Sequence, residues 1–67
     1  DALSVDAEQI LTYMRSRNGA MPFWDKSDPE DIRERFNMSK AAFKRALGHL
    51  MKQDKIYQEE GWTYEKK

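Results

Sequence analysis

The chain has 67 residues, of which 36% are charged and 39% hydrophobic, and its 12 basic and 12 acidic side chains give a formal net charge of zero. A chain of this length holds one small domain and leaves no room for a substrate domain. Because it lacks cysteine and any apolar run of about 18 residues, we expect a soluble cytoplasmic domain, without disulfides or a membrane span, that folds by packing alone.

The first predicted element is an amphipathic helix over about residues 5–18. Its apolar side chains recur at spacings of three and four residues, at Ala7, Ile10, Leu11 and Met14. Either Ser4 or Asp6 can cap its start, and Asn18-Gly19 supplies the left-handed conformation that ends a helix. The next apolar run, over 20–23, contains a proline and is suited to a brief edge strand.

A helix-turn-helix unit is predicted next. Asp28 is the expected cap of a short helix, with Pro29 at its first position. Asn37 tolerates a left-handed conformation and interrupts the chain briefly, after which Ser39 caps a longer helix that runs to about Asp54. On this longer helix we expect one apolar stripe to face the core, formed by Phe43, Ala46, Leu47, Leu50 and Met51.

The C-terminal part predicts a β-hairpin with strands over 56–58 and 62–64, joined by a three-residue loop. If the two strands pair without a bulge across this loop, Ile56, Trp62 and Tyr64 lie on one face of the hairpin. A bulge would shift that register. The element order is that of a winged helix-turn-helix domain. We therefore predict a mainly α fold with a small β-sheet: a three-helix core, a short strand and a C-terminal hairpin.

One stretch carries a more specific signal, the sequence DKSDPEDIRERFNMSKAAFKRALGHLMKQDKI from Asp25 to Ile56. Its most specific parts are the runs 25–29 and 38–48. This stretch resembles the C-terminal winged-helix domain of the CvfB/YitL family of bacterial RNA-binding proteins, and the resemblance covers nearly the whole chain. It implies that residues 1–67 are a single accessory RNA-contacting module, excised from a longer protein in which OB-fold RNA-binding repeats precede it. The implied context is post-transcriptional gene regulation in the cytosol.

Positive charge gathers on the predicted long helix although the whole chain is neutral. Residues 1–39 hold five basic and eight acidic side chains, whereas residues 40–55 hold five basic and one acidic. The candidate RNA-binding residues are Lys40, Lys44, Arg45, Lys52 and Lys55, whose charges can neutralise backbone phosphates. An ordinary solvated helix face has a similar composition, but the imbalance of sign and the resemblance favour nucleic acid. Gly48, in the middle of this face, is expected to mark the close approach of another backbone.

Aromatic side chains add candidates for base stacking on single-stranded RNA. Trp24 and Tyr57 are the candidate stacking residues, and Tyr13 is a third aromatic that is not clearly assigned to the core. In small domains, tyrosine and tryptophan also pack their rings against the core while the polar end of the side chain stays hydrated. Trp62 and Phe43 are expected in the core.

Two other functions stay open. One is a winged helix that contacts protein, which docks on neighbouring domains of the same chain or mediates dimerisation through its acidic first half or through Phe23-Trp24. The other is a DNA-binding regulator. The usual DNA pose is disfavoured because the first turn of the long helix offers only Lys40 and two alanines for base contacts. The acidic loop at Glu59-Glu60 would also repel phosphate.

The sequence does not predict an enzyme. His49 is the only histidine and is expected to be half exposed, and there is no cysteine nucleophile and no glycine-rich phosphate loop. Asp25, Asp28 and Asp31 lack the alternating ligands and the glycine of an EF-hand. We expect no metal, cofactor, small-molecule substrate or membrane partner.

Overall fold

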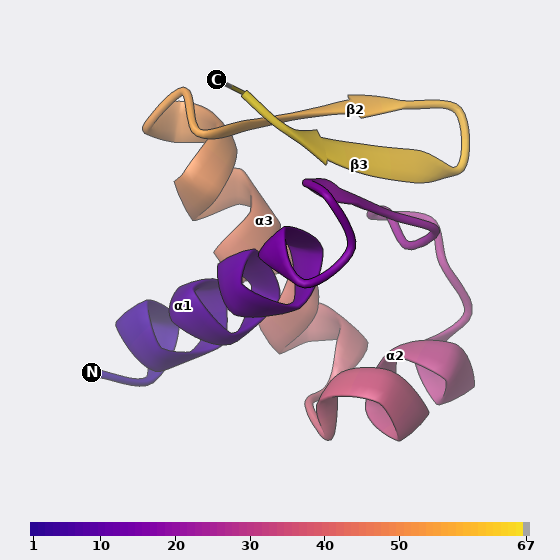
Figure 1. Ribbon diagram of the computed structural model, residues 1–67. Helices are drawn as coiled ribbons and strands as arrows, with labels where there is room; N and C mark the ends of the chain where they lie inside the picture. Colours follow the sequence, from indigo (N-terminus) through magenta and orange to yellow (C-terminus); the bar gives the residue numbers. More distant parts are fainter. Residues whose placement is uncertain (67) are drawn as a thin grey trace.

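Three α-helices and a three-stranded antiparallel sheet make up residues 1–66, the part of the chain that the computed structural model describes (Figure 1). The order is α1 (Ala2–Arg15), β1 (Ala20–Met21), α2 (Pro29–Phe36), α3 (Lys40–Lys52), β2 (Ile56–Glu59) and β3 (Trp62–Glu65). The strands are ordered β1-β3-β2, so β1 is the predicted short edge strand. The predicted winged helix-turn-helix fold is confirmed.

The first helix begins earlier than the sequence predicted. Asp1 caps α1, because its side chain accepts a hydrogen bond of 2.9 Å from the backbone N–H of Ser4. The prediction of Ser4 or Asp6 as the cap was wrong, since Asp1 offers the same capping chemistry one turn earlier. The helix ends before Asn18 (φ 63°) and Gly19 (φ 84°), which adopt the predicted left-handed conformation.

The helix-turn-helix unit forms where its capping residues predicted it. The Asp28 side chain accepts a hydrogen bond of 2.9 Å from the backbone N–H of Glu30 at the start of α2. Asn37 (φ 56°) takes the left-handed conformation after α2. Ser39 then caps α3 by accepting a hydrogen bond of 3.1 Å from the N–H of Ala42. These local interactions fix the angle at which α3 leaves α2.

Side chains from all three helices and from the sheet meet in one apolar core. Its largest fully buried apolar members are Phe43, Ile10, Met14, Met21, Ile32, Leu47 and Leu50. The stripe predicted on α3 is confirmed except at Met51, which is 39% exposed. Met51 follows Leu50 by 100° around the helix and falls past the edge of the buried face.

The hairpin is tighter than predicted. Glu59 pairs with Trp62, so the loop has two residues, Glu60 and Gly61, rather than three. Gly61 (φ 81°) takes the predicted left-handed conformation.

This shorter loop changes which side chains share a face of the sheet. Tyr57 lies across from Tyr64, and residues directly opposite each other point to the same side. Ile56 and Thr63 are buried against the core, whereas Trp62 points away from it and is 39% exposed. The prediction that Ile56, Trp62 and Tyr64 share one face was therefore wrong, because a one-residue difference in pairing reverses the faces.

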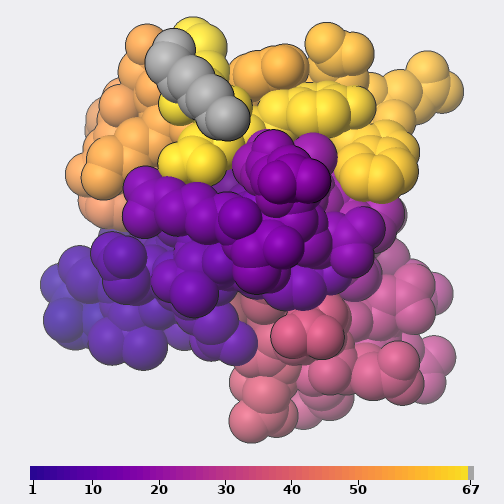
Figure 2. All heavy atoms as spheres, in the orientation of Figure 1, coloured from indigo at the N-terminus to yellow at the C-terminus, as the bar shows by residue number. Residues whose placement is uncertain are grey.

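The three helices lie together on one side of the sheet, and the hairpin forms the top of the molecule in the views shown (Figures 1 and 2). In this orientation α1 crosses in front of α3 (Figure 1). The outer surface of the hairpin carries no other element of residues 1–66. Among these residues, no helix has the length and apolar character that a membrane span requires.

Candidate nucleic-acid interface

The predicted cations lie on or just after α3, on the side that faces away from the core. Lys44, Arg45, Lys52 and Lys55 are exposed, and Lys40 is half-buried at the start of the helix. The ion pairs within residues 1–66 are Arg15–Glu65 and Lys66–Asp54. None of the five predicted cations takes part in either pair. Their charges are therefore available to solvent or to a ligand.

The helix geometry explains why this side is basic. Phe43 and Leu47 anchor α3 in the core, and residues about half a turn away are forced outward. We call these residues the outer ridge of α3: Ala41, Arg45, Gly48 and Lys52, all of them exposed. Lys44 lies beside the ridge, and His49 is half-exposed on the flank toward α1, as predicted.

Gly48 lies in the middle of the outer ridge with open space around it. A Cβ atom at Gly48 would meet nothing within 4 Å beyond its own stretch of helix. The prediction that another backbone approaches this glycine is therefore wrong for residues 1–66. Glycine at an exposed helical position costs roughly 1 kcal/mol relative to alanine. The packing of the described chain gives no reason for it.

The two predicted stacking residues have different surroundings. Trp24 is half-buried in the loop before α2, where the Nζ of Lys26 lies 5.5 Å from its ring centroid. Tyr57 is 41% exposed on the outer face of the sheet, and its ring stacks on Tyr64 with centroids 5.2 Å apart. Trp62 lies on the same face, with its centroid 6.4 Å from that of Tyr64. Its predicted place in the core is wrong.

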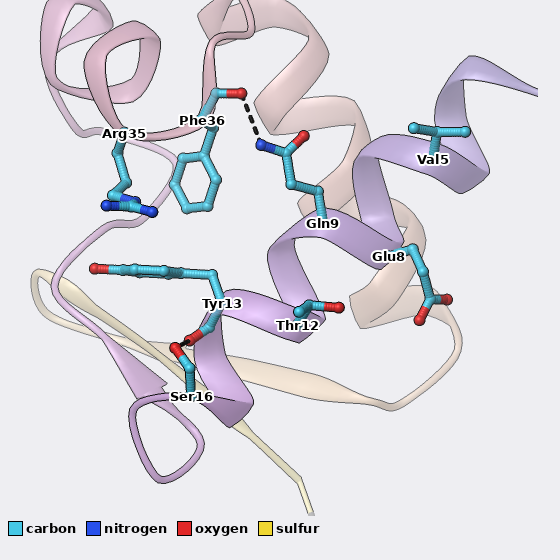
Figure 3. Close-up of a pocket in the computed structure, with 8 residues that line it drawn as sticks. All are labelled: Val5, Glu8, Gln9, Thr12, Tyr13, Ser16, Arg35 and Phe36. Carbon is cyan, nitrogen blue, oxygen red and sulfur yellow. Dashed lines mark hydrogen bonds between the residues drawn. The ribbon is translucent and has the colours of Figure 1, made fainter.

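The third aromatic, Tyr13, is engaged in packing. Its ring contacts Phe23 and Phe36 edge-to-face, with centroids 6.1 Å and 5.3 Å away, and the guanidinium carbon of Arg35 lies 4.5 Å from its centroid. Phe23 is likewise half-buried in this contact, so Phe23-Trp24 is not a fully free surface. Figure 3 shows Arg35 above the Tyr13 ring, at one end of a groove between α1 and α2.

This groove has a volume of about 630 Å³ and no lining residue from α3. Gln9 donates a hydrogen bond of 2.8 Å from Nε2 to the backbone carbonyl of Phe36 across it (Figure 3). Val5, at its edge, is 63% exposed. Within residues 1–66 no three His, Asp or Glu side chains lie close enough to hold a metal ion. The charged residues that line the groove are Glu8 and Arg35.

Two features of the structure bear on duplex DNA. The first turn of α3 presents Lys40, which is half-buried, and then Ala41 and Ala42. The hairpin tip carries Glu59 and Glu60, both exposed, on a two-residue loop. Neither end offers the bidentate base contact or the basic wing that major-groove reading uses.

The sequence has relatives in bacteria. The family model for the CvfB-like winged helix domain matches residues 8–64. The chain is 84% identical over all its 67 residues to the protein YitL of Bacillus subtilis, of which it covers 22%. It is 51% identical over 61 residues to conserved virulence factor B of Staphylococcus aureus, a match that covers 91% of this chain and 20% of the relative.

A solved structure has the same fold. It is a multidomain protein with nucleic acid binding domains from Streptococcus pneumoniae, and it superposes with a TM-score of 0.88 at 49% sequence identity. The match covers 91% of this chain and 21% of that one. The chain thus spans about a fifth of the length of the relatives that it matches.

Proposed function

Because the chain belongs to the CvfB-like winged helix domain family, we propose that it is an accessory nucleic-acid-binding module of a longer bacterial protein. The proposed ligand is single-stranded RNA, and the proposed setting is post-transcriptional regulation in the cytoplasm. The module is proposed to be the C-terminal domain of its parent and to work beside OB-fold RNA-binding repeats. A weak second contact on the same chain raises overall affinity through effective concentration.

The observation that carries this proposal is the set of exposed cations on and after α3. Lys44, Arg45, Lys52 and Lys55 are exposed, and no acidic side chain of residues 1–66 pairs with them. Each phosphate that such a side chain neutralises releases counterions, and this release favours binding at low salt. The resemblance to a multidomain structure with nucleic acid binding domains supports the same ligand class.

A single strand suits this surface better than a duplex. The start of α3 is poor in base-reading side chains, and the hairpin tip is acidic at Glu59 and Glu60. A flexible strand can follow the cations of α3 and avoid the tip. A sequence-specific DNA regulator is therefore the less favoured alternative.

The proposal is tested by reversing charge on α3 and measuring the binding of a fluorescently labelled single-stranded RNA by anisotropy. We expect the double variant Lys44→Glu/Arg45→Glu to bind at least about ten-fold more weakly, because two attractive phosphate contacts become repulsive. The matched control is Arg17→Glu/Arg33→Glu, which makes the same change in net charge at exposed positions outside α3. Equal weakening in both variants would mean that only overall charge matters, and would contradict the proposal.

The second candidate function is docking on another domain of the same chain, and the groove between α1 and α2 is the feature that favours it. Val5 is exposed there beside an apolar surface of Tyr13 and Phe36. Docking through apolar contacts survives added salt and survives Lys44→Glu/Arg45→Glu, whereas RNA binding through α3 does not. Val5→Asp separates the two, because it weakens only docking.

A further inference from the structure

We propose that the outer face of the β-sheet is a stacking site for unpaired nucleobases. The site consists of Tyr57, Tyr64 and Trp62, which we call the outer aromatic set. The inference rests on the proposed function, because it gives the same class of ligand a second contact surface. That surface lies on the hairpin rather than on α3 and recognises bases instead of phosphates.

The first observation is the mutual orientation of the rings. Tyr57 and Tyr64 face each other across β2 and β3, and Trp62 neighbours Tyr64 along β3. In both pairs the ring planes are only 21° apart. The contacts of the half-buried Tyr13 with Phe23 and Phe36 have planes 61° and 84° apart, and the buried Phe36–Phe43 pair has planes 34° apart. The outer rings therefore stack on one another, and a base can stack on the ring faces that they leave uncovered.

The second observation is exposure. Tyr57 is 41% exposed and Trp62 is 39% exposed, although both are large aromatic residues in a domain with a small core. The opposite side of the sheet supplies the core contacts through Ile56 and Thr63, so the outer aromatic set is not needed to close the core. Adjacent exposed aromatic side chains favour an interaction site more than singly exposed apolar residues do.

The third observation is the positive charge where α3 leads into β2, and it selects nucleic acid as the ligand. The backbone N–H of Lys66 donates a hydrogen bond of 2.8 Å to the carbonyl of Lys55, so pairing of the two strands continues beyond Ile56. Lys55 directly precedes β2, two residues before Tyr57, and it also lines the cleft between α1 and α3. Lys55 is exposed and has no acidic partner within residues 1–66.

Along the chain, Lys55 lies between Lys52 at the end of α3 and Tyr57 on β2, and so between the outer ridge and the outer aromatic set. A single strand can therefore place phosphates at Lys52 and Lys55 and a base on the ring of Tyr57. Glu59 lies across from Trp62 near the tip of the hairpin. Its negative charge repels phosphates, so we expect the phosphates of the bound strand to stop short of the tip. Cations followed by exposed rings are the combination that single-strand binding surfaces use.

The test uses Trp62 as its own reporter. In a Trp24→Phe background Trp62 is the only tryptophan of the chain. A short oligoadenylate is titrated in, and then an abasic strand with the same number of phosphates. We expect the oligoadenylate to quench the emission of Trp62 and the abasic strand to leave it unchanged. Unchanged emission with saturating oligoadenylate would overturn the inference.

Variants at Trp62 provide the affinity measurement. Trp62→Leu keeps an apolar side chain but removes the π-face, and should weaken oligoadenylate binding by about ten-fold, within the range for one stacked base. Trp62→Phe keeps a ring and should retain most of the affinity. Binding of the abasic strand should be the same in all three proteins. Circular dichroism checks folding, and the emission titration, which leaves Trp62 in place, keeps the test decisive if Trp62→Leu is destabilised.

The result separates this inference from the proposed function. Lys44→Glu/Arg45→Glu should weaken both strands, whereas Trp62→Leu should weaken only the strand that has bases. If the charge variant loses binding and Trp62→Leu does not, the stacking site is refuted and the basic face stands. If Trp62→Leu loses binding and the charge variant does not, the role of α3 is refuted and the stacking site stands.

Discussion

The Thr63 hydroxyl donates a hydrogen bond of 2.7 Å to the backbone carbonyl of Phe23, which joins the central strand of the sheet to the loop before α2. Thr63 is fully buried, and among residues 1–66 no other polar residue is classed as buried. A buried carbonyl without a donor is costly, so this bond holds the hairpin to that loop.

Replacing Thr63 by valine keeps the shape of the side chain and removes the donor. We expect Thr63→Val to lower the free energy of unfolding by about 1–3 kcal/mol, measured by urea denaturation. Thr12→Val, at an exposed position of α1, is the control and should change stability by less than about 0.5 kcal/mol. Similar losses at the two positions would contradict the role given to the Thr63 hydroxyl.

The two glycines Gly48 and Gly61 both have open space where a Cβ would be, but they differ in backbone conformation. Gly48→Ala should raise the free energy of unfolding by roughly 1 kcal/mol, because alanine is the better helix former. Gly61→Ala should lower it by about 1–2 kcal/mol, because φ at Gly61 is 81°. Thermal unfolding of the two variants measures the difference. Destabilisation by Gly48→Ala would show that the space at this position is not open.

Asn37 provides a test of the turn between α2 and α3. Its φ of 56° is left-handed, a conformation that glycine adopts without steric cost and alanine does not. Asn37→Gly should leave stability unchanged within about 1 kcal/mol, whereas Asn37→Ala should lower it by about 1–2 kcal/mol. Equal effects of the two substitutions on the urea midpoint would argue against a strained turn.

The helix-turn-helix could be predicted from sequence because its signals are local. Asp28 before Pro29, and Ser39 before α3, satisfy helix ends within three residues of themselves. The faces of the hairpin could not be predicted in this way. They depend on whether the loop has two residues or three, and the cross-strand pairing of Tyr57 with Tyr64 decides this.

The candidate site was predictable to a similar extent. Helical periodicity placed Arg45 and Lys52 on the outside of α3, where the structure has them exposed. Trp62 was missed because a large aromatic residue is usually buried in a small domain. No local signal identified it, because Gly61 is compatible with a two-residue and with a three-residue loop. The half-burial of Lys40 depends on tertiary packing and had no local signal.

Salt dependence tests how many cations meet phosphates. For a single strand, the slope of log affinity against log salt is about −0.7 for each neutralised phosphate. Arg45→Gln should make this slope shallower by about 0.7, because one contact is removed. Arg33→Gln on α2 is the matched control and should leave the slope unchanged. A series of anisotropy titrations at increasing salt gives both values, and equal slopes for the unchanged protein and Arg45→Gln would contradict direct contact by Arg45.

Backbone amide shifts during titration with a short single-stranded RNA are the most direct test of the claim that α3 meets nucleic acid. We expect the largest shifts at Arg45, Gly48 and Lys52 and around Lys55, extending into the hairpin at Tyr57. The residues that line the groove between α1 and α2, such as Val5 and Gln9, should shift little. Shifts confined to that groove, or no shifts at saturating RNA, would contradict the account.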